Sequence, residues 1–248
     1  MLINLLADTL PFYRRPARLQ CLACSAPRPP VAWSGLIGVL TGHRACLYCG
    51  VQRGWRSPIV EIVLIISASL LYYGASDPLV FVIDLFVVFV YTLIIVTDIE
   101  HRLILHVVTF PSAIIIGLVG SLDLSKGPGK TLLGGLVGFG GFLLLYFMGG
   151  FFASLMGRLR GRPVEEIAFG FGDVTLAGLI GLTVGFPGVI VALVIGILLA
   201  GLFSLLYILS SLLLRRYNPF MPIPYGPFLV LGCLFIYFDG GKILQNML

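Results

Sequence analysis

The sequence predicts an all-α, polytopic membrane protein with about seven transmembrane helices and an N-terminal extramembrane region. Three observations predict this fold class: 58% of the 248 residues are hydrophobic, only 11% are charged, and the mean hydropathy is +1.06. Soluble domains contain roughly 25% charged residues, so a soluble globular domain is excluded. The apolar content also excludes a disordered chain, and five cysteines are too few for a small disulfide scaffold.

Residues 1–57 differ in composition from the rest and are predicted to lie outside the membrane. They contain seven arginines, four of the five cysteines and several prolines. Their apolar start is short, contains Asp8, and lacks a basic lead-in or a small-residue cleavage site, so it does not resemble a signal peptide. We therefore divide the chain into an extramembrane region, 1–57, and a transmembrane domain, 58–248.

From residue 58 onward, apolar runs alternate with short polar or Gly/Pro breaks. A bilayer core of roughly 30 Å requires about 20 helical residues for each crossing. Seven runs are candidates, at 58–74, 78–97, 103–122, 131–152, 167–186, 189–213 and 222–238. The chain is therefore expected to cross the membrane seven times, with its two ends on opposite sides.

The distribution of Lys and Arg predicts the orientation, because short cytoplasmic loops retain positive charge. With residues 1–57 in the cytoplasm, that side holds 13 of the 16 basic residues, and only Lys126, Lys130 and Lys242 lie on the other. The charge surplus is therefore assigned to loops, and no motif indicates nucleic-acid binding. Membrane lipid is the expected surrounding, with the arginine-containing loop 153–169 near the headgroups.

Acids at the membrane boundary are the candidate catalytic residues, because an ionised carboxylate near hydrocarbon is costly. Asp98 ends the second span and Asp173 begins the fifth, so the topology places both at the cytoplasmic face. Neighbouring carboxylates share a proton, which leaves one able to activate water, as in aspartic proteases. Gly170 and Gly172 would let an extended substrate approach closely. The competing interpretation makes Asp98 a solvated loop residue beside Arg102 and the glycines packing residues.

Four motifs, in order, resemble those of the bacterial type IV prepilin peptidases. Gly-Phe-Gly-Asp at 170–173 resembles the G-x-G-D motif of these membrane-embedded aspartic proteases, and Asp-Ile-Glu-His-Arg at 98–102 resembles their first aspartate motif. Pro-Tyr-Gly-Pro at 224–227 resembles the start of their last helix. Pro-Ile-Val-Glu at 58–61 resembles the end of their cytoplasmic loop.

The resemblance implies that Asp98 and Asp173 are the catalytic pair of an aspartic endopeptidase, one as general base and one as general acid. The substrate would be the N-terminal segment of a type IV prepilin or type II secretion pseudopilin, cleaved at the cytoplasmic face of the bacterial inner membrane. The residues implied to bind substrate or support the motifs are Gly170, Gly172, Glu61, Pro224, Gly226 and Pro227.

Bifunctional members of the family also methylate the new N-terminus with S-adenosylmethionine. The sequence contains no Gly-rich strand-helix unit for that cofactor, so N-methylation is implied by resemblance alone.

The chain departs from the family pattern in three places. Leu105-His106 stands where the first motif usually has Pro and then Asp or Asn, and the residues before Pro58 differ from the usual Arg-Tyr-Pro. Family members usually begin with another membrane helix that ends in an Asn and, later, a Pro. We interpret Asn4 and Pro11 as remnants of that tail, so that either the chain starts late or a first helix is missing.

Two C-x2-C knuckles, Cys21 with Cys24 and Cys46 with Cys49, are separated by slightly more than the usual spacing of zinc sites. Four thiolates give closed tetrahedral zinc coordination, which is typical of a structural site. Disulfides are the alternative, and a reducing cytoplasm disfavours them. Many prepilin peptidases carry a similar tetracysteine loop. Cys233 is expected to be an ordinary buried residue.

Several other features are expected to be structural. Asp84 shares a helix face with the first aspartate of the pair and is predicted to be hydrogen-bonded. Glu61 is predicted to pair with an arginine, although a role near the substrate's new amino terminus stays open. Glu100 and His101 are expected to be solvated in a loop. The glycines between 134 and 150 predict close packing of the fourth span.

Other functions would explain some of these residues but not all of them. A cation- or proton-coupled transporter would use Asp84, Asp98 and Asp173 as ion sites, but it leaves the cysteines unexplained, and no inverted repeat is found. A preflagellin peptidase or presenilin-like protease is disfavoured by the zinc knuckles. A non-enzymatic scaffold leaves both aspartates without a role. The sequence does not predict the oligomeric state.

Overall fold

The computed structural model describes residues 1–15, 19–21, 23–123, 126–160, 170–214 and 224–245. Within these ranges the chain is helical, and its only β-structure is two isolated bridges. The chain divides into two compact units, Met1–Leu105 and His106–Leu248, each described by itself. This division follows packing, whereas the predicted limit at residue 57 concerns the membrane and stays a prediction.

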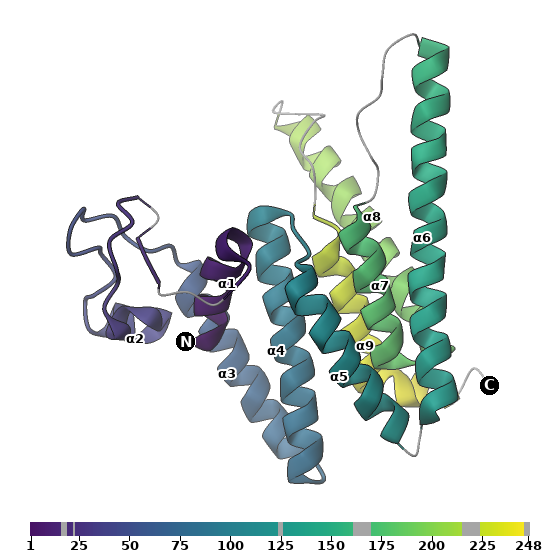
Figure 1. Ribbon diagram of the computed structural model, residues 1–248, viewed down its shortest axis with the longest axis horizontal. Coiled ribbons are helices and arrows are strands. Elements are labelled where there is room, and N and C mark those ends of the chain that lie inside the picture. The colour runs from purple at the N-terminus through teal and green to yellow at the C-terminus, as the bar shows by residue number, and fades with distance from the viewer. Residues whose placement is uncertain (16–18, 22, 124–125, 161–169, 215–223, 246–248) are drawn as a thin grey trace. The chain divides into compact units, whose positions relative to one another are not determined.

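Among its described residues, the first unit contains five helical segments. Figure 1 shows the course of the chain through them. They are α1 (Leu2–Tyr13), the 3-10 helix η1 (Pro30–Trp33), α2 (Gly35–Leu40), α3 (Arg56–Gly74) and α4 (Pro78–His101). The two long apolar helices, α3 and α4, pack together, and α1 packs against both of them. α4 begins at a proline, which suits a first helical turn. It ends where Arg102 adopts the left-handed conformation (φ 53°).

The second unit contains α5 (His106–Leu122), α6 (Gly127–Arg160), α7 (Phe171–Val184), α8 (Gly188–Leu213) and α9 (Gly226–Gln245). α7 is its central helix, because it packs against all four others. Its residues from Val174 to Gly181 are all buried. α7 therefore forms the core of this unit.

Glycines bring the backbones of α6 and α7 into direct contact. A Cβ atom added at Gly134 would lie 2.3 Å from the carbonyl oxygen of Gly181, and one at Gly138 would lie 2.2 Å from that of Ala177. This confirms the predicted close packing for the first half of α6. Gly140 and Gly141 have nothing within 4 Å of such an atom, so the packing role does not extend to them.

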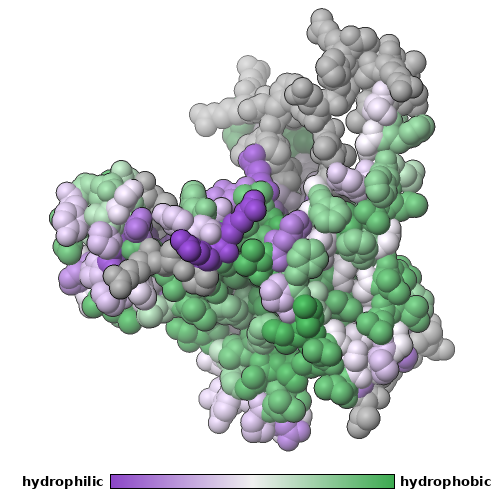
Figure 2. Space-filling view, viewed as in Figure 1, coloured by the Kyte–Doolittle hydropathy of each residue, from purple (hydrophilic) through white to green (hydrophobic). Residues whose placement is uncertain are grey.

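The seven predicted spans correspond in order to α3 through α9, within the part of the chain that the structure describes. Four of these helices (α3, α4, α6 and α8) are long and apolar enough to cross a membrane, and α5, α7 and α9 are shorter apolar helices. Figure 2 shows hydrophobic surface over α3 and α4. The predicted fold class, an all-helical membrane protein, is confirmed.

Several boundaries differ from those predicted. α4 continues to His101 instead of ending at 97, so Asp98 and Glu100 lie in its last turn and not in a loop. α6 continues to Arg160, because no proline interrupts the segment that was predicted as a loop from 153. The predicted starts of the fifth and seventh spans, at 167 and 222, lie outside the described residues.

No secondary structure was predicted before residue 57, and the structure adds the helix α1 there. Ile3, Ala7 and Leu10 are buried at helical spacing on one face of α1, which packs on α3 and α4. Asp8 lies within this helix, beside the buried stripe. The periodicity was therefore present in the sequence.

Candidate active site and metal centre

Asp98 lies in the last turn of α4 and is only 6% exposed. Its carbonyl oxygen accepts a hydrogen bond from the N–H of Arg102 at 2.8 Å, which closes the helix. The preceding residue, Thr97, is also buried, and its hydroxyl donates to the carbonyl of Leu93 at 3.0 Å. Asp98 is therefore a buried helical residue at the end of an apolar helix, not the solvated loop residue of the competing interpretation.

Asp173 occupies the first turn of α7. Its Oδ2 atom accepts a hydrogen bond from the N–H of Gly170 at 3.1 Å, and its own N–H donates to the carbonyl of Gly170 at 3.1 Å. A carboxylate at this end of a helix satisfies an otherwise unbonded N–H group and interacts favourably with the helix dipole. Gly170 is exposed and Gly172 half-buried. The side chain is therefore held where the buried helix begins.

Aromatic rings surround the start of α7. Phe171, between the two motif glycines, is 43% exposed, and its ring centroid lies 5.8 Å from His106, 6.5 Å from Phe139 and 6.3 Å from Tyr146. This aromatic cluster was not predicted from the sequence. His106, which departs from the family pattern, thus packs against the G-x-G-D segment.

The predicted pairing of Asp98 and Asp173 stays a prediction, because Asp98 belongs to the first unit and Asp173 to the second. The third motif lies where predicted: Pro224 precedes α9, Gly226 is buried at its first position, and Pro227 follows. The helix start is bonded through the carbonyl of Tyr225, which accepts from the N–H of Phe228 at 3.1 Å.

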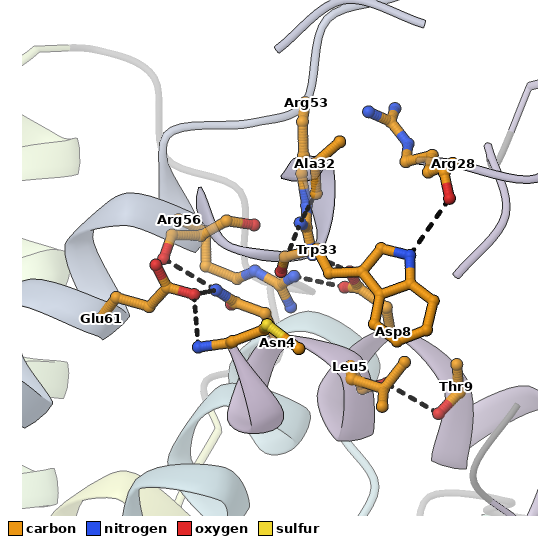
Figure 3. Close-up of polar contacts among 12 residues, drawn as sticks. Asn4, Leu5, Asp8, Thr9, Arg28, Ala32, Trp33, Arg53, Arg56 and Glu61 are labelled. Carbon is orange, nitrogen blue, oxygen red and sulfur yellow. Dashed lines mark hydrogen bonds and ion pairs between the residues drawn. The ribbon is translucent and has the colours of Figure 1, made fainter. Parts of the chain in front are cut away.

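Glu61 lies on α3 and is 5% exposed. Contrary to the prediction, it pairs with none of the arginines in the part of the chain that the structure describes. Its Oε1 atom accepts from Asn4 Nδ2 at 2.8 Å and contacts the amino group of Met1 at 2.6 Å. Its Oε2 atom accepts from Ser34 Oγ at 2.7 Å and from the N–H of Leu36 at 3.0 Å. Figure 3 shows the contact with Asn4. Glu61 therefore joins α1 and the start of α2 to α3, which is a structural role.

The four cysteines of the two knuckles form one cluster. Their Sγ atoms all lie within 4.8 Å of one another, with Cys21 3.5 Å from Cys49 and Cys24 3.7 Å from Cys46. A disulfide would require an S–S distance of roughly 2 Å, so these are thiols. A tetrahedral zinc ion bound at roughly 2.3 Å separates its sulfur ligands by about 3.8 Å. The spacing therefore fits a four-coordinate metal ion.

The two knuckles share one backbone pattern. The N–H of the first cysteine donates five residues ahead, and its carbonyl accepts from four residues ahead. A β-bridge joins the residue before the first cysteine to the sixth residue after it. The bonds are Cys21 to Ala26 (2.8 Å), Ser25 to Cys21 (2.8 Å), Cys46 to Val51 (3.0 Å) and Gly50 to Cys46 (2.9 Å), with bridges Gln20–Pro27 and Ala45–Gln52. This internal repeat presents the two cysteine pairs in the same way.

Backbone N–H groups also prepare the buried cysteine of each knuckle for metal binding. Hydrogen bonds from Ala23 and Cys24 lower the pKa of the Cys21 thiol to about 6. Hydrogen bonds from Cys49 and Tyr48 lower the pKa of the Cys46 thiol. The thiolate is the form that binds metal ions. The donor set therefore fits a metal ion.

A cavity of about 580 Å³ lies between the cysteine segment and the end of α4. Its lining includes Asp8 and Phe12 of α1, Arg53 and Arg56, and Glu100 and His101 of α4. The rings of Phe12 and His101 meet edge to face at 5.4 Å. Charged groups of both signs therefore gather beside the helix end that carries Asp98.

Comparison with known proteins places these residues in context. Residues 85–205 match the type IV leader peptidase family, and this segment contains both aspartates. A prepilin leader peptidase/N-methyltransferase of Bacillus subtilis is 26% identical over 237 residues, which is 92% of this chain and 84% of that protein. A protein of the same name from Xanthomonas campestris pv. campestris is 26% identical over 152 residues, 61% of this chain and 47% of that protein. No solved structure matches.

Proposed function

We propose that the chain cleaves the N-terminal leader of type IV prepilins or type II secretion pseudopilins, because residues 85–205 match the type IV leader peptidase family and a relative named as a prepilin leader peptidase aligns with 92% of the chain. The observation that carries this proposal is the placement of two aspartates at the ends of apolar helices within the family segment. Asp98 is buried in the last turn of α4, and Asp173 stands in the first turn of α7. The protein is thus a membrane-embedded aspartic endopeptidase.

Asp98 and Asp173 act as the catalytic pair in this proposal. One carboxylate takes a proton from the attacking water while the other, protonated, donates to the nitrogen of the scissile peptide bond. Gly170 and Gly172 leave room beside Asp173 for an extended peptide, because they carry no Cβ. The apolar segment of the substrate stays in the bilayer and its leader in the water, so the scissile bond reaches the aspartates at the boundary.

We place the active site and the cysteine segment at the cytoplasmic face of the bacterial inner membrane. The concentration of arginine in residues 1–57 supports this orientation, since cytoplasmic segments retain positive charge.

The four cysteines bind one structural zinc ion in this proposal, supported by the tetrahedral fit of their sulfur atoms. Purified protein should contain about one zinc ion per chain, and Cys24→Ser combined with Cys49→Ser should lose it. Metal analysis under reducing conditions that finds none would remove the zinc assignment alone.

N-methylation of the new N-terminus is the second activity that we propose, supported by the names of both relatives. S-adenosylmethionine would supply the methyl group. The cavity beside the end of α4 has about 580 Å³, within the range of small-molecule sites, so its size fits such a cofactor.

Cleavage of a prepilin in detergent or lipid, with mass spectrometry of the product's N-terminus, tests the peptidase. Asp98→Asn and Asp173→Asn should each lower the rate by roughly 10²–10⁴-fold, the usual contribution of acid–base catalysis. Asp77→Asn, an exposed acid at the other end of α4, is the matched control and should cleave normally. Wild-type rates in a correctly inserted Asp98→Asn or Asp173→Asn protein would refute the pair. A product heavier by one methylene unit with S-adenosylmethionine would establish methylation.

A further inference from the structure

Asp8 of α1 lies between two arginine side chains. Its Oδ2 atom pairs with Arg53 Nη2, and its Oδ1 atom pairs with Arg56 Nη2. The side chains of Asp8, Arg53 and Arg56 are 15%, 11% and 21% exposed, so these ion pairs are largely removed from water. Figure 3 shows the groups converging on Asp8.

Arg53 connects this ion pair to the second cysteine knuckle. Its N–H donates to the carbonyl of Arg44 at 3.0 Å, and its carbonyl accepts from Arg44 Nε at 2.7 Å. Its guanidinium also donates to the carbonyls of Ala32 at 3.0 Å and Trp33 at 3.3 Å. The position of Arg53 is therefore set by the folded knuckle and by η1.

Arg56 connects the same carboxylate to the end of α4. Its Nη1 atom pairs with Oε2 of Glu100 at 2.5 Å. Glu100 is two residues after Asp98. Phe12 of α1 also meets the ring of His101 in this turn. An ionic and an aromatic contact therefore hold the last turn of α4. The two negative charges of Asp8 and Glu100 equal the two positive charges of the arginines. Each group contacts the next, from the second knuckle to the end of α4.

We propose that Asp8, Arg53, Arg56 and Glu100, here named the Asp8 relay, position the Asp98 end of α4 and make that position depend on metal loading of the cysteines. The inference rests on the proposed function. With a metal ion bound to its cysteines, the second knuckle would be held closed and would present Arg53 to Asp8. Asp8 then orients Arg56 toward Glu100. Without metal this series loosens, and the catalytic carboxylate is misplaced while the substrate's apolar segment still binds.

A four-protein cycle tests the coupling. It compares wild type, Glu100→Gln, Cys24→Ser with Cys49→Ser, and the combination of all three substitutions. Each change alone should lower kcat by roughly ten- to a hundredfold, the cost of misplacing a catalytic group by about 1 Å, with KM nearly unchanged. The combined protein should be no slower than the slower of the two, because both changes break one relay. Asp77→Asn is the control and should leave kcat and its metal dependence unchanged.

Arg56→Lys separates charge from geometry. A lysine keeps the positive charge, but its single head does not bridge two carboxylates as a guanidinium does. It should therefore behave like Glu100→Gln, whereas a simple requirement for charge predicts full activity.

Hydrogen exchange at the Arg102 amide gives a readout that needs no activity, because this N–H closes the helix on Asp98. Exchange should be slow in the metal-loaded wild type, and faster after chelation or in Glu100→Gln. Chelation should have no further effect in Glu100→Gln. The relay is refuted if the two kinetic losses multiply, or if Glu100→Gln lowers only the melting temperature. A wild-type protein that cleaves no prepilin would refute the proposed function. Hydrogen exchange at the Arg102 amide would then still test the Asp8 relay.

Discussion

The end of α4 and the start of α7 each carry a candidate catalytic aspartate, but different forces hold them. One ion pair, from Arg56 at the start of α3, and one aromatic contact, from Phe12 of α1, hold the last turn of α4. Backbone contacts to α6 hold α7, whose core residues are fully buried. Ion pairs depend on charge and on a neighbouring loop, whereas close packing depends only on shape. We therefore expect the Asp98 end to be the more adjustable of the two and the Asp173 end to be the more rigid.

The largest expected effect tests the rigid side of this comparison. Gly134→Ala places a Cβ atom 2.3 Å from the carbonyl oxygen of Gly181 and 2.7 Å from backbone atoms of Gly185, so no flexible side chain can move aside. We expect a loss of about 3 kcal/mol in the free energy of unfolding, the upper end of usual overpacking costs. Gly140→Ala on the same helix meets nothing within 4 Å and should be neutral or slightly stabilising. Thermal unfolding in detergent compares them, and equal midpoints would refute the contact.

A smaller loss is expected when the centre of the relay is removed. Asp8→Asn leaves two guanidiniums without their shared carboxylate. Breaking a fully buried pair costs roughly 3–5 kcal/mol, and the partial exposure of this one reduces the expected loss to about 2 kcal/mol. Thermal unfolding should show this loss for Asp8→Asn and almost none for Asp77→Asn. If a high salt concentration abolished the difference in stability between wild type and Asp8→Asn, the ion pair would be exposed to solvent instead.

Glu61→Gln tests the second polar cluster of the first unit. The amide of glutamine carries donors where the carboxylate accepts from Ser34 and from the N–H of Leu36. Leaving a buried donor unsatisfied costs about 1–3 kcal/mol, and we expect a value near 1 kcal/mol because the Ser34 hydroxyl can rotate. Unfolding measurements check this, and prepilin KM should not change. A raised KM at unchanged stability would instead assign Glu61 to substrate binding.

The smallest expected effect compares the two knuckles. Ser25 has a φ of 56° where the equivalent residue of the second knuckle, Gly50, has 72°. A residue with a Cβ is strained by roughly 1 kcal/mol in this region. Ser25→Gly should therefore raise metal affinity a few-fold, and Gly50→Ser should lower it to a similar extent, in competition with a chelator. Equal affinities in both variants would show that the turn carries no strain.

The fold and the motif residues were largely predictable from the sequence. The ion pairs and hydrogen bonds that hold these residues in place were not. Continuous apolar runs predicted the helices α3 to α9, and the glycines at 134 and 138 predicted the close packing of α6, because both signals are local. Asp8, Arg56 and Glu100 are separated by more than 40 positions, and no spacing rule connects them. Glu61 was predicted to pair with an arginine, because opposite charges can be matched from a sequence. Its hydroxyl, amide and backbone donors come from distant segments, and no charge pattern identifies them.

The central claim is that Asp98 and Asp173 form one catalytic pair, and proximity tests it most directly. Asp98→Cys combined with Asp173→Cys would be treated in membranes with a short bifunctional thiol reagent, and linked peptides would be identified by mass spectrometry. Asp77→Cys with Asp173→Cys is the control, because position 77 lies at the opposite end of α4. We expect efficient linking of positions 98 and 173 and none of the control pair. A correctly folded protein that links neither pair would contradict the account.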